Sequence, residues 1–191
     1  GEPDRTDSDM PILLNHQVLA YYGKPGANNM GILGRFSKEE IARQLSSLAA
    51  EYDRVNGPLG VKRAFYLMYG TVWPGGEIGI LSEAVTKEYV EYAQREGMLV
   101  FLDHQIGKYT VEEAMNRLLP WLRYPNVHLA LDPEWRTTKP MKEIGSITAE
   151  ELNKAQIMLQ ERMERDGLKG SRMLVVHQFK WYMISGRERV Q

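Results

Sequence analysis

The sequence predicts an α/β protein built on a parallel sheet. Apolar, β-prone runs alternate along the chain with amphipathic helical patterns, and about 30 residues separate one run from the next. The runs are continuously apolar, which is typical of strands buried on both faces. Strands joined by helices in this order form right-handed βαβ units. We expect one domain over residues 16–191, preceded by a flexible, polar leader at residues 1–15.

The strands are predicted from their content of β-branched, aromatic and aliphatic residues and from the turn-forming residues that bound them. Five such runs occur, at Val18 to Gly23, Arg63 to Val72, Met98 to Gln105, Val127 to Trp135 and Met173 to Phe179.

The helices are predicted from their N-terminal caps. In a capping box a hydroxyl and a glutamate three residues later satisfy free backbone amides of the first turn. Four segments have this spacing: Ser37 to Glu40, Thr110 to Glu113, Thr148 to Glu151 and Ser185 to Glu188. Ser82 supplies a simpler cap. Apolar residues then recur at helical spacing, as at Ile41, Leu45, Leu48 and Tyr52, so each helix has one face to bury against a sheet.

The number of strands limits the choice of fold. A closed (β/α)₈ barrel usually takes about 250 residues, whereas this chain has 191. We therefore expect a TIM-barrel-like fold truncated to about five βα units, completed by further chain after Gln191 or by self-association. The alternative is an open parallel α/β sheet. A doubly wound nucleotide-binding sheet is disfavoured, because the glycine-rich segment from Gly23 to Gly34 fits no phosphate-binding spacing.

Composition excludes several classes of function. The formal net charge of −1 and the absence of a basic cluster argue against a nucleic-acid partner. No apolar run reaches the roughly 20 residues that span a bilayer. The absence of cysteine excludes disulfides, thiolate zinc sites and cysteine nucleophiles. We expect no cofactor.

The strongest functional signal is the pair Asp132 and Glu134, at the end of the fourth predicted strand. In barrels the active site lies at the carboxyl ends of the strands. Two residues apart on an extended segment, both side chains face one cleft, with Cα atoms roughly 6.5 Å apart. Pro133 restricts the backbone between them. Glycoside hydrolysis uses two carboxyl groups about 5 to 9.5 Å apart. Asp103, at the neighbouring strand end, adds a third carboxyl group.

A structural interpretation of the same acids remains open. Asp132 would then cap a turn, and Glu134 would pair with Arg136 or a nearby lysine. Alternation along the strand places His104 towards the helices if Asp103 and Gln105 face inward. His128, in mid-strand, is expected to be structural.

Further candidates for substrate binding also follow strand ends. Aromatic rings there can stack on a sugar or simply fill the core. The predicted substrate-binding residues are Tyr21, Tyr22, Tyr69, Trp73, Gln105, Trp135, His177 and Gln178.

A divalent metal is the competing explanation for the acids. Asp103, Asp132, Glu134 and His177 would form an oxygen-rich site with one imidazole, as in metal-dependent phosphodiesterases built on the same barrel. Such enzymes usually have a histidine at the end of the first strand, where this chain has Tyr21-Tyr22-Gly23. The spacing is not diagnostic, and we do not assign a metal.

Several ordered motifs together resemble a poorly characterised bacterial family. They are Tyr21-Tyr22-Gly23-Lys24-Pro25, Met30 to Gly34, Leu102 to Gln105, Leu129 to Trp135, Ile144-Gly145-Ser146 and Val175 to Phe179. Members are exported or lipid-anchored proteins with a TIM-barrel domain similar to glycoside hydrolases, and they continue through further βα units. The resemblance therefore implies an extracellular or cell-envelope location and additional barrel after Gln191.

The resulting hypothesis is a glycan-binding barrel protein that hydrolyses a glycosidic bond, with Glu134 as the acid, Asp132 as orienting or second carboxylate and Asp103 assisting. The alternative from another class is a non-catalytic barrel that binds a saccharide or builds an assembly through its surface.

Overall fold

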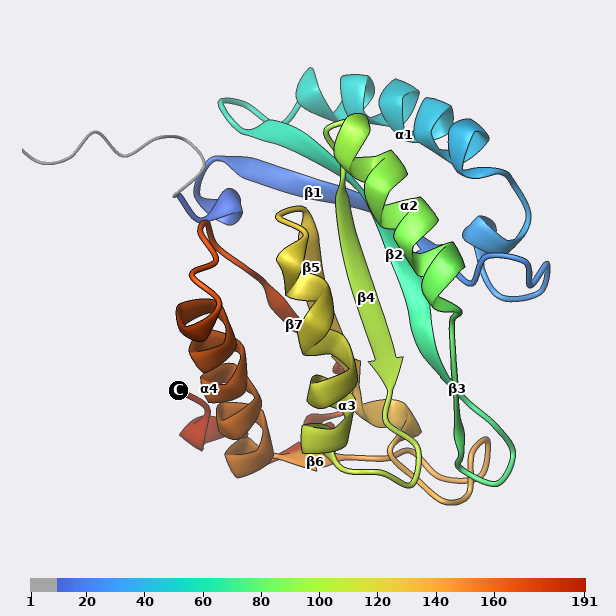
Figure 1. Cartoon of the computed structure of the whole chain (residues 1–191), viewed down its shortest axis with the longest axis vertical. Coiled ribbons are helices and arrows are strands. Elements are labelled where there is room, and N and C mark those ends of the chain that lie inside the picture. Colours follow the sequence, from blue (N-terminus) through green and yellow to red (C-terminus); the bar gives the residue numbers. More distant parts are fainter. Residues whose placement is uncertain (1–9) are drawn as a thin grey trace, which may run out of the picture.

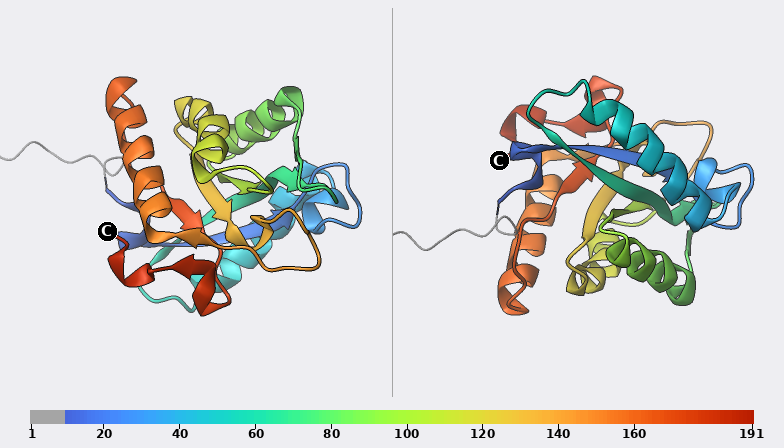
Figure 2. Two further views of the ribbon diagram at one scale, coloured as in Figure 1. Left: turned by 90° about the horizontal axis from the view of Figure 1, so that it is seen from below. Right: turned by 90° about the horizontal axis from the view of Figure 1, so that it is seen from above.

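The computed structural model describes residues 10–191. Within these residues, four α-helices cover one face of a curled sheet that has five parallel strands (Figures 1 and 2). The helices are α1 (Lys38–Asp53), α2 (Glu83–Arg95), α3 (Val111–Leu118) and α4 (Ala149–Arg165). The predicted α/β class is therefore confirmed in the form of a half-barrel. Most of the predicted leader lies outside the described residues, and its end forms the 3₁₀ turn Ile12–Leu14.

The parallel strands follow one another across the sheet in the order in which they occur along the chain. They are β1 (His16–Gly23), β2 (Gly60–Val72), β4 (Leu99–Gln105), β5 (Val127–Asp132) and β7 (Leu174–Val176). A doubly wound sheet reverses its strand order at a switch point, and this sheet shows no reversal over residues 10–191. All carboxyl ends of these strands consequently lie at one edge.

Three short strands were not predicted. β3 (Ile78–Ile80) pairs antiparallel with β2, and β6 (Ile147–Thr148) pairs with β8 (Ile184–Ser185) in a small separate sheet. The β6 strand leads directly into the first turn of α4. The last predicted strand was too long, because regular pairing of β7 ends at Val176.

The predicted caps mostly begin helices. Thr110 and Thr148 form complete capping boxes with Glu113 and Glu151 at the starts of α3 and α4. Ser37 and Ser82 accept hydrogen bonds from the first turns of α1 and α2. The fourth predicted box is wrong: Ser185 lies in β8, and Gly186 has φ +68°, so the chain forms only the 3₁₀ turn Arg187–Arg189.

The main core lies between the sheet and the helices. One row of strand residues, Leu67, Leu102 and Leu129, is in register across β2, β4 and β5 and is fully buried there. Apolar residues of every helix close this layer, among them Ile41, Leu45, Val90, Met115 and Leu152. Because side chains alternate along a strand, the intervening residues face the concave side of the sheet.

The concave side holds a smaller apolar cluster around Ala64, Leu99 and Phe101, where β4 begins. His128 lies beside it. Its ring stacks on Phe101 at 5.2 Å, and its Nδ1 accepts a hydrogen bond of 2.9 Å from the backbone N–H of Met173. Burial, with a contribution from Arg172, lowers the pKa of His128 to about 4. His128 is therefore a neutral structural group, which joins β5 to the start of β7.

This burial predicts a loss of stability in acid. The unfolded chain takes up a proton at His128 near pH 6.5, whereas the folded chain resists it down to about pH 4. Stability is therefore present above pH 6.5 and is lost as the pH falls towards 4, by up to about 3 kcal/mol from this residue. In His128→Gln, urea unfolding from pH 7.5 to 4.5 should show a shallower loss, although the variant is less stable at pH 7.5. Equal pH slopes for the two proteins would contradict the assignment.

Candidate functional site

Two carboxyl groups and one imidazole meet at the carboxyl ends of β4, β5 and β7. Asp103 lies on the concave side of β4, and Asp132 ends β5. His177 follows β7, and its backbone N–H donates to the carbonyl of Leu131, which extends the pairing by one residue. The imidazole lies between the two acids, with Nε2 3.7 Å from Asp103 Oδ1 and Nδ1 3.7 Å from Asp132 Oδ2. We call these three residues the acid–histidine cluster.

Two tyrosines hold the cluster from the concave side. The hydroxyl of Tyr22 donates to Asp103 Oδ2 at 3.1 Å. The hydroxyl of Tyr66 is hydrogen-bonded to His177 Nε2 at 2.7 Å. The two rings meet edge to face, with centroids 5.4 Å apart, and Tyr66 stacks on Phe101 at 5.3 Å. An aromatic row therefore crosses the first three parallel strands next to the cluster.

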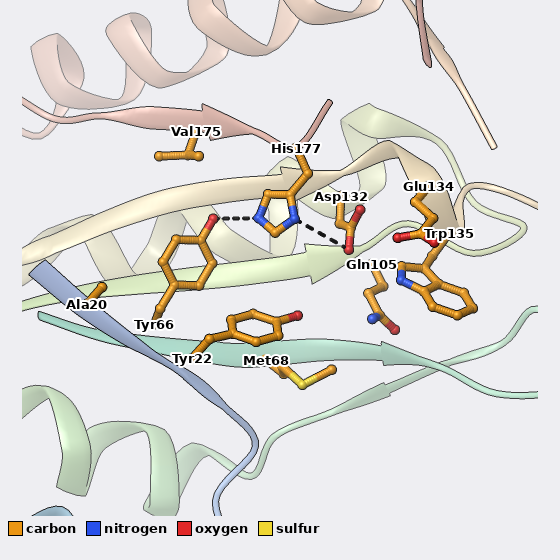
Figure 3. Close-up of a pocket in the computed structure, with 10 residues that line it drawn as sticks. All are labelled: Ala20, Tyr22, Tyr66, Met68, Gln105, Asp132, Glu134, Trp135, Val175 and His177. Carbon is orange, nitrogen blue, oxygen red and sulfur yellow. Dashed lines mark hydrogen bonds and ion pairs between the residues drawn. The ribbon is translucent and has the colours of Figure 1, made fainter. Parts of the chain in front are cut away.

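A pocket of about 640 Å³ opens over this arrangement (Figure 3). Its lining residues come from every parallel strand and from the turn after β5: Ala20, Tyr22, Tyr66, Met68, Gln105, Asp132, Glu134, Trp135, Val175 and His177. Asp103 is fully buried and is not a lining residue, although it contacts Tyr22. The pocket thus combines aromatic rings with two carboxyl groups, an amide and an imidazole.

Glu134 and Trp135 reach the pocket from a turn and not from a strand. Pro133–Trp135 form a 3₁₀ turn directly after β5, so the predicted extended geometry of the acid pair is wrong. Proline at the first position of the turn favours this helical conformation. Gly145 donates to the carbonyl of Glu134 at 2.7 Å, and Gly107 donates to that of Trp135 at 2.9 Å. The turn is therefore fixed by hydrogen bonds from two separate loops.

Gly145 has a steric reason to be glycine. A Cβ atom there would lie 2.5 Å from the carbonyl oxygen of Pro133 and closer still to that of Arg136. Only a residue without a side chain lets the backbone approach this closely. The Ile144-Gly145-Ser146 motif therefore positions Glu134 indirectly.

The structural alternative for the acid pair is not observed. Arg136 forms its ion pair with Glu151, at 2.6 Å, and not with Glu134. Asp132 precedes the turn, but its side chain makes no capping hydrogen bond. The turn still contributes to Asp132, because the backbone N–H of Glu134 lowers the pKa of that carboxyl group.

Burial changes the acidity of the groups in the cluster. Desolvation raises the pKa of Asp103 to about 7, and the hydrogen bond from Tyr22 opposes this rise. Desolvation and repulsion by Asp103 raise the pKa of Asp132, which His177 partly offsets. Burial and the neighbouring acids also raise the pKa of Tyr22 and of Tyr66. Both tyrosines are therefore neutral hydrogen-bonding groups.

The structure places the predicted site residues in two groups. Asp132, Glu134, Tyr22, Gln105, Trp135 and His177 line the pocket, and Asp103 lies directly behind it. The others lie apart. Tyr21 and Tyr69 pack in the layer between sheet and helices, Trp73 is 59% exposed beyond the pocket, and Gln178 donates to the carbonyls of Lys180 and Trp181.

Strand alternation accounts for this division. Tyr22 and Tyr66 are in register on β1 and β2 and share the concave face, whereas Tyr21 and Tyr69 point to the helices. His104 likewise lies on the helix side, beside Arg117, as alternation predicted. Sequence reasoning missed Tyr66 and Met68. Their signal was available, since both lie on β2 in the alternation that leaves Phe65 and Leu67 in the main core.

Gln105 has a structural role as well as a place in the pocket. Its Oε1 accepts from the backbone N–H of Val72 at 2.8 Å. This contact follows a register shift in β2, between Met68 and Gly70. The amide nitrogen of Gln105 remains the group available to a ligand.

No protein-family model, curated protein or solved structure significantly matches this chain. Over residues 10–191, none of the helices combines the length with the apolar composition that a membrane span requires.

The buried charge predicts a stabilising substitution. The folded-state pKa of Asp103 lies above its ordinary value of 3.8, so stability falls as the pH rises from about 4 through 7 and the carboxyl group ionises. In metal-free buffer at pH 8, Asp103→Asn should raise the free energy of unfolding by about 2 kcal/mol, measured by urea denaturation.

The gain should disappear at pH 4.5, where the carboxyl group is protonated in the folded protein. The exposed Asp53→Asn is the matched control and should change stability little at either pH. A destabilised Asp103→Asn at pH 8 would show that the carboxylate is better compensated than the geometry indicates.

Proposed function

We propose that this protein binds a glycan in the pocket and hydrolyses a glycosidic bond there, with Glu134 as the proton donor and Asp132 as the orienting or second carboxylate. One observation carries the proposal: both acids line the same pocket as Tyr22, Tyr66 and Trp135. An acid pair beside aromatic rings suits a ligand with apolar C–H faces and many hydroxyl groups.

The pocket has the size and chemistry for a small saccharide. Its volume of about 640 Å³ falls within the range of about 300 to 1,000 Å³ that is usual for small-molecule sites. The aromatic rings offer faces and edges to the C–H groups of a sugar. The Gln105 amide and His177, at opposite sides of Asp132 in Figure 3, offer hydrogen bonds to hydroxyl groups.

The chemistry follows the general requirement for two carboxyl groups. Glu134 gives its proton to the glycosidic oxygen as the bond from that oxygen to the anomeric carbon breaks. Water then supplies a hydroxyl group to the anomeric carbon, and its remaining proton returns to Glu134, which restores the acid. Asp132 stabilises the developing positive charge or orients the substrate. Asp103 assists by holding Tyr22 and facing His177.

The fold supports this location for the activity. Sequential strand order and a curled sheet are features of (β/α)₈ barrels, in which sites lie at the carboxyl ends of the strands. We propose a TIM-barrel relationship on this basis. The resemblance of the sequence motifs to exported, glycoside-hydrolase-like proteins would place the activity in the cell envelope or outside the cell.

The test is Glu134→Gln against a panel of oligosaccharides, with turnover and ligand binding measured separately. The substitution removes the proton donor and preserves size. It should lower turnover by about 10² to 10⁴-fold and leave the dissociation constant of the glycan nearly unchanged. The exposed Glu161→Gln, on the outer surface of α4, should retain full turnover.

Other outcomes discriminate between the classes of function. Saccharide binding without turnover by the wild-type protein would replace the enzyme with a binding protein. Absence of both binding and turnover across the panel would overturn the proposal. Loss of binding in Tyr22→Ala and Trp135→Ala, with Trp73→Ala unaffected, would assign the bound saccharide to this pocket.

A further inference from the structure

We infer that Asp103, Asp132 and His177 form a binding site for one divalent transition-metal ion, of the Mn²⁺ or Zn²⁺ type. The site lies behind and beside the glycan pocket, at the carboxyl ends of β4, β5 and β7. The ion would share Asp132 and His177 with the proposed glycan site. Its binding can be measured without a glycan, and only the use of the ion by a sugar rests on the proposed function.

The geometry of the cluster suits a shared ion. One ligand atom from each of the three residues lies within 4.8 Å of the other two. Ligand atoms about 2.1 Å from one ion are at most about 4.2 Å apart. The distance from His177 Nδ1 to Asp132 Oδ2, 3.7 Å, already meets this limit. Small side-chain rotations would bring all three groups into coordination distance, because each comes from the end of a strand in the same sheet.

A second observation also favours a cation ligand for the two acids. Asp103 is 0% exposed and Asp132 is 3% exposed. Within residues 10–191, Oδ1 of each is buried without a hydrogen-bond partner. A buried carboxylate oxygen without a partner is energetically unfavourable. A divalent ion would compensate both charges at once and would give both free oxygens a partner.

The surrounding hydrogen bonds leave one possible ligand atom free on Asp103 and one on His177. Tyr22 occupies Oδ2 of Asp103, so Oδ1 remains for the ion. Tyr66 occupies Nε2 of His177, so Nδ1 faces Asp132 and remains for the ion. Metal-bound histidines commonly use their second nitrogen in such a bond, which fixes the ring and the tautomer.

The donor set indicates the kind of ion. Two carboxylates and one imidazole suit Mn²⁺ or Zn²⁺. Ca²⁺ takes six to eight oxygen ligands and would find too few here. Three protein ligands leave coordination positions open, and Asp132 and His177 both line the pocket. A bound ion would therefore present those positions to water or to hydroxyl groups of a glycan, while Glu134 stays free to transfer a proton.

The test is binding of Mn²⁺ and Zn²⁺ to chelator-treated protein, measured by calorimetry and by metal analysis after dialysis. The wild-type chain should bind one ion, with weaker binding of Ca²⁺. Asp103→Asn and His177→Gln should weaken binding by at least about 100-fold. Tyr66→Phe, which removes only the outer hydrogen bond, should weaken it by about 10-fold.

Matched controls separate this site from other ligands on the surface. His16→Gln and Asp166→Asn should bind the ion like the wild-type chain. Circular dichroism checks folding, and Asp103→Asn is expected to remain folded because it removes a buried charge. Failure of the wild-type chain to bind either ion, or unchanged binding in Asp103→Asn and His177→Gln, would overturn the site.

Glycan binding is measured with and without chelator in the same series. If the protein binds the ion but binds no glycan, the proposed function is wrong and the ion site stands. If the protein turns over a glycan in the presence of chelator and binds no ion, the ion site is wrong and the proposed function stands.

Discussion

The burial of one face of the parallel sheet against the helices is the constraint on which the rest of the structure depends. Leu67, Leu102 and Leu129 lie in one row of that face and are inaccessible to solvent. Alternation then sends the residues between them to the concave side. Because the helices and the main core stabilise the sheet from one side, the other side is free to carry groups selected for chemistry.

Some of the groups on the concave face are energetically unfavourable. Asp103 and Asp132 occupy positions where an apolar residue would pack more favourably, and their Oδ1 atoms lack partners among residues 10–191. Neighbouring positions on the same face, such as Ala130 and Val175, remain apolar. The unfavourable groups are therefore concentrated at the strand ends, which is typical of a functional site and not of a defect spread through the core.

Local signals in the sequence predicted most of the scaffold but only part of the site. The capping boxes at Thr110 and Thr148 depend on contacts three residues apart, so the sequence contains all the information they need. Ser185 has the same spacing and fails, because tertiary pairing draws it into β8 and Gly186 takes a left-handed conformation. The local sequence pattern cannot predict that strand pairing will win over the helix cap at Ser185.

The site shows the same limit in its aromatic residues. Proximity to a strand end singled out Tyr21, Tyr22 and Tyr69 equally, whereas only the face of the strand decides which of them lines the pocket. The register of β1 against β2 brings Tyr22 beside Tyr66, and that pairing spans a helix and two loops. The acids of the cluster could be named from the sequence. That Tyr21 and Tyr69 lie on the opposite face of the sheet from these acids could be known only from the fold.

The proposed proton donor and the acid–histidine cluster are held by different means, which bears on how they can act together. Asp103, Asp132 and His177 are fixed by strand pairing, and the bond from His177 N–H to Leu131 sets the imidazole against Asp132. Glu134 lies on a turn that Gly145 and Gly107 fix through the backbone alone, and its side chain forms no ion pair within residues 10–191. In the proposed function, a cluster whose backbone is fixed by strand pairing would orient the ligand, while a carboxyl group without an ion pair would approach the leaving group. On the proposed function, this division would let one pocket combine binding with proton transfer.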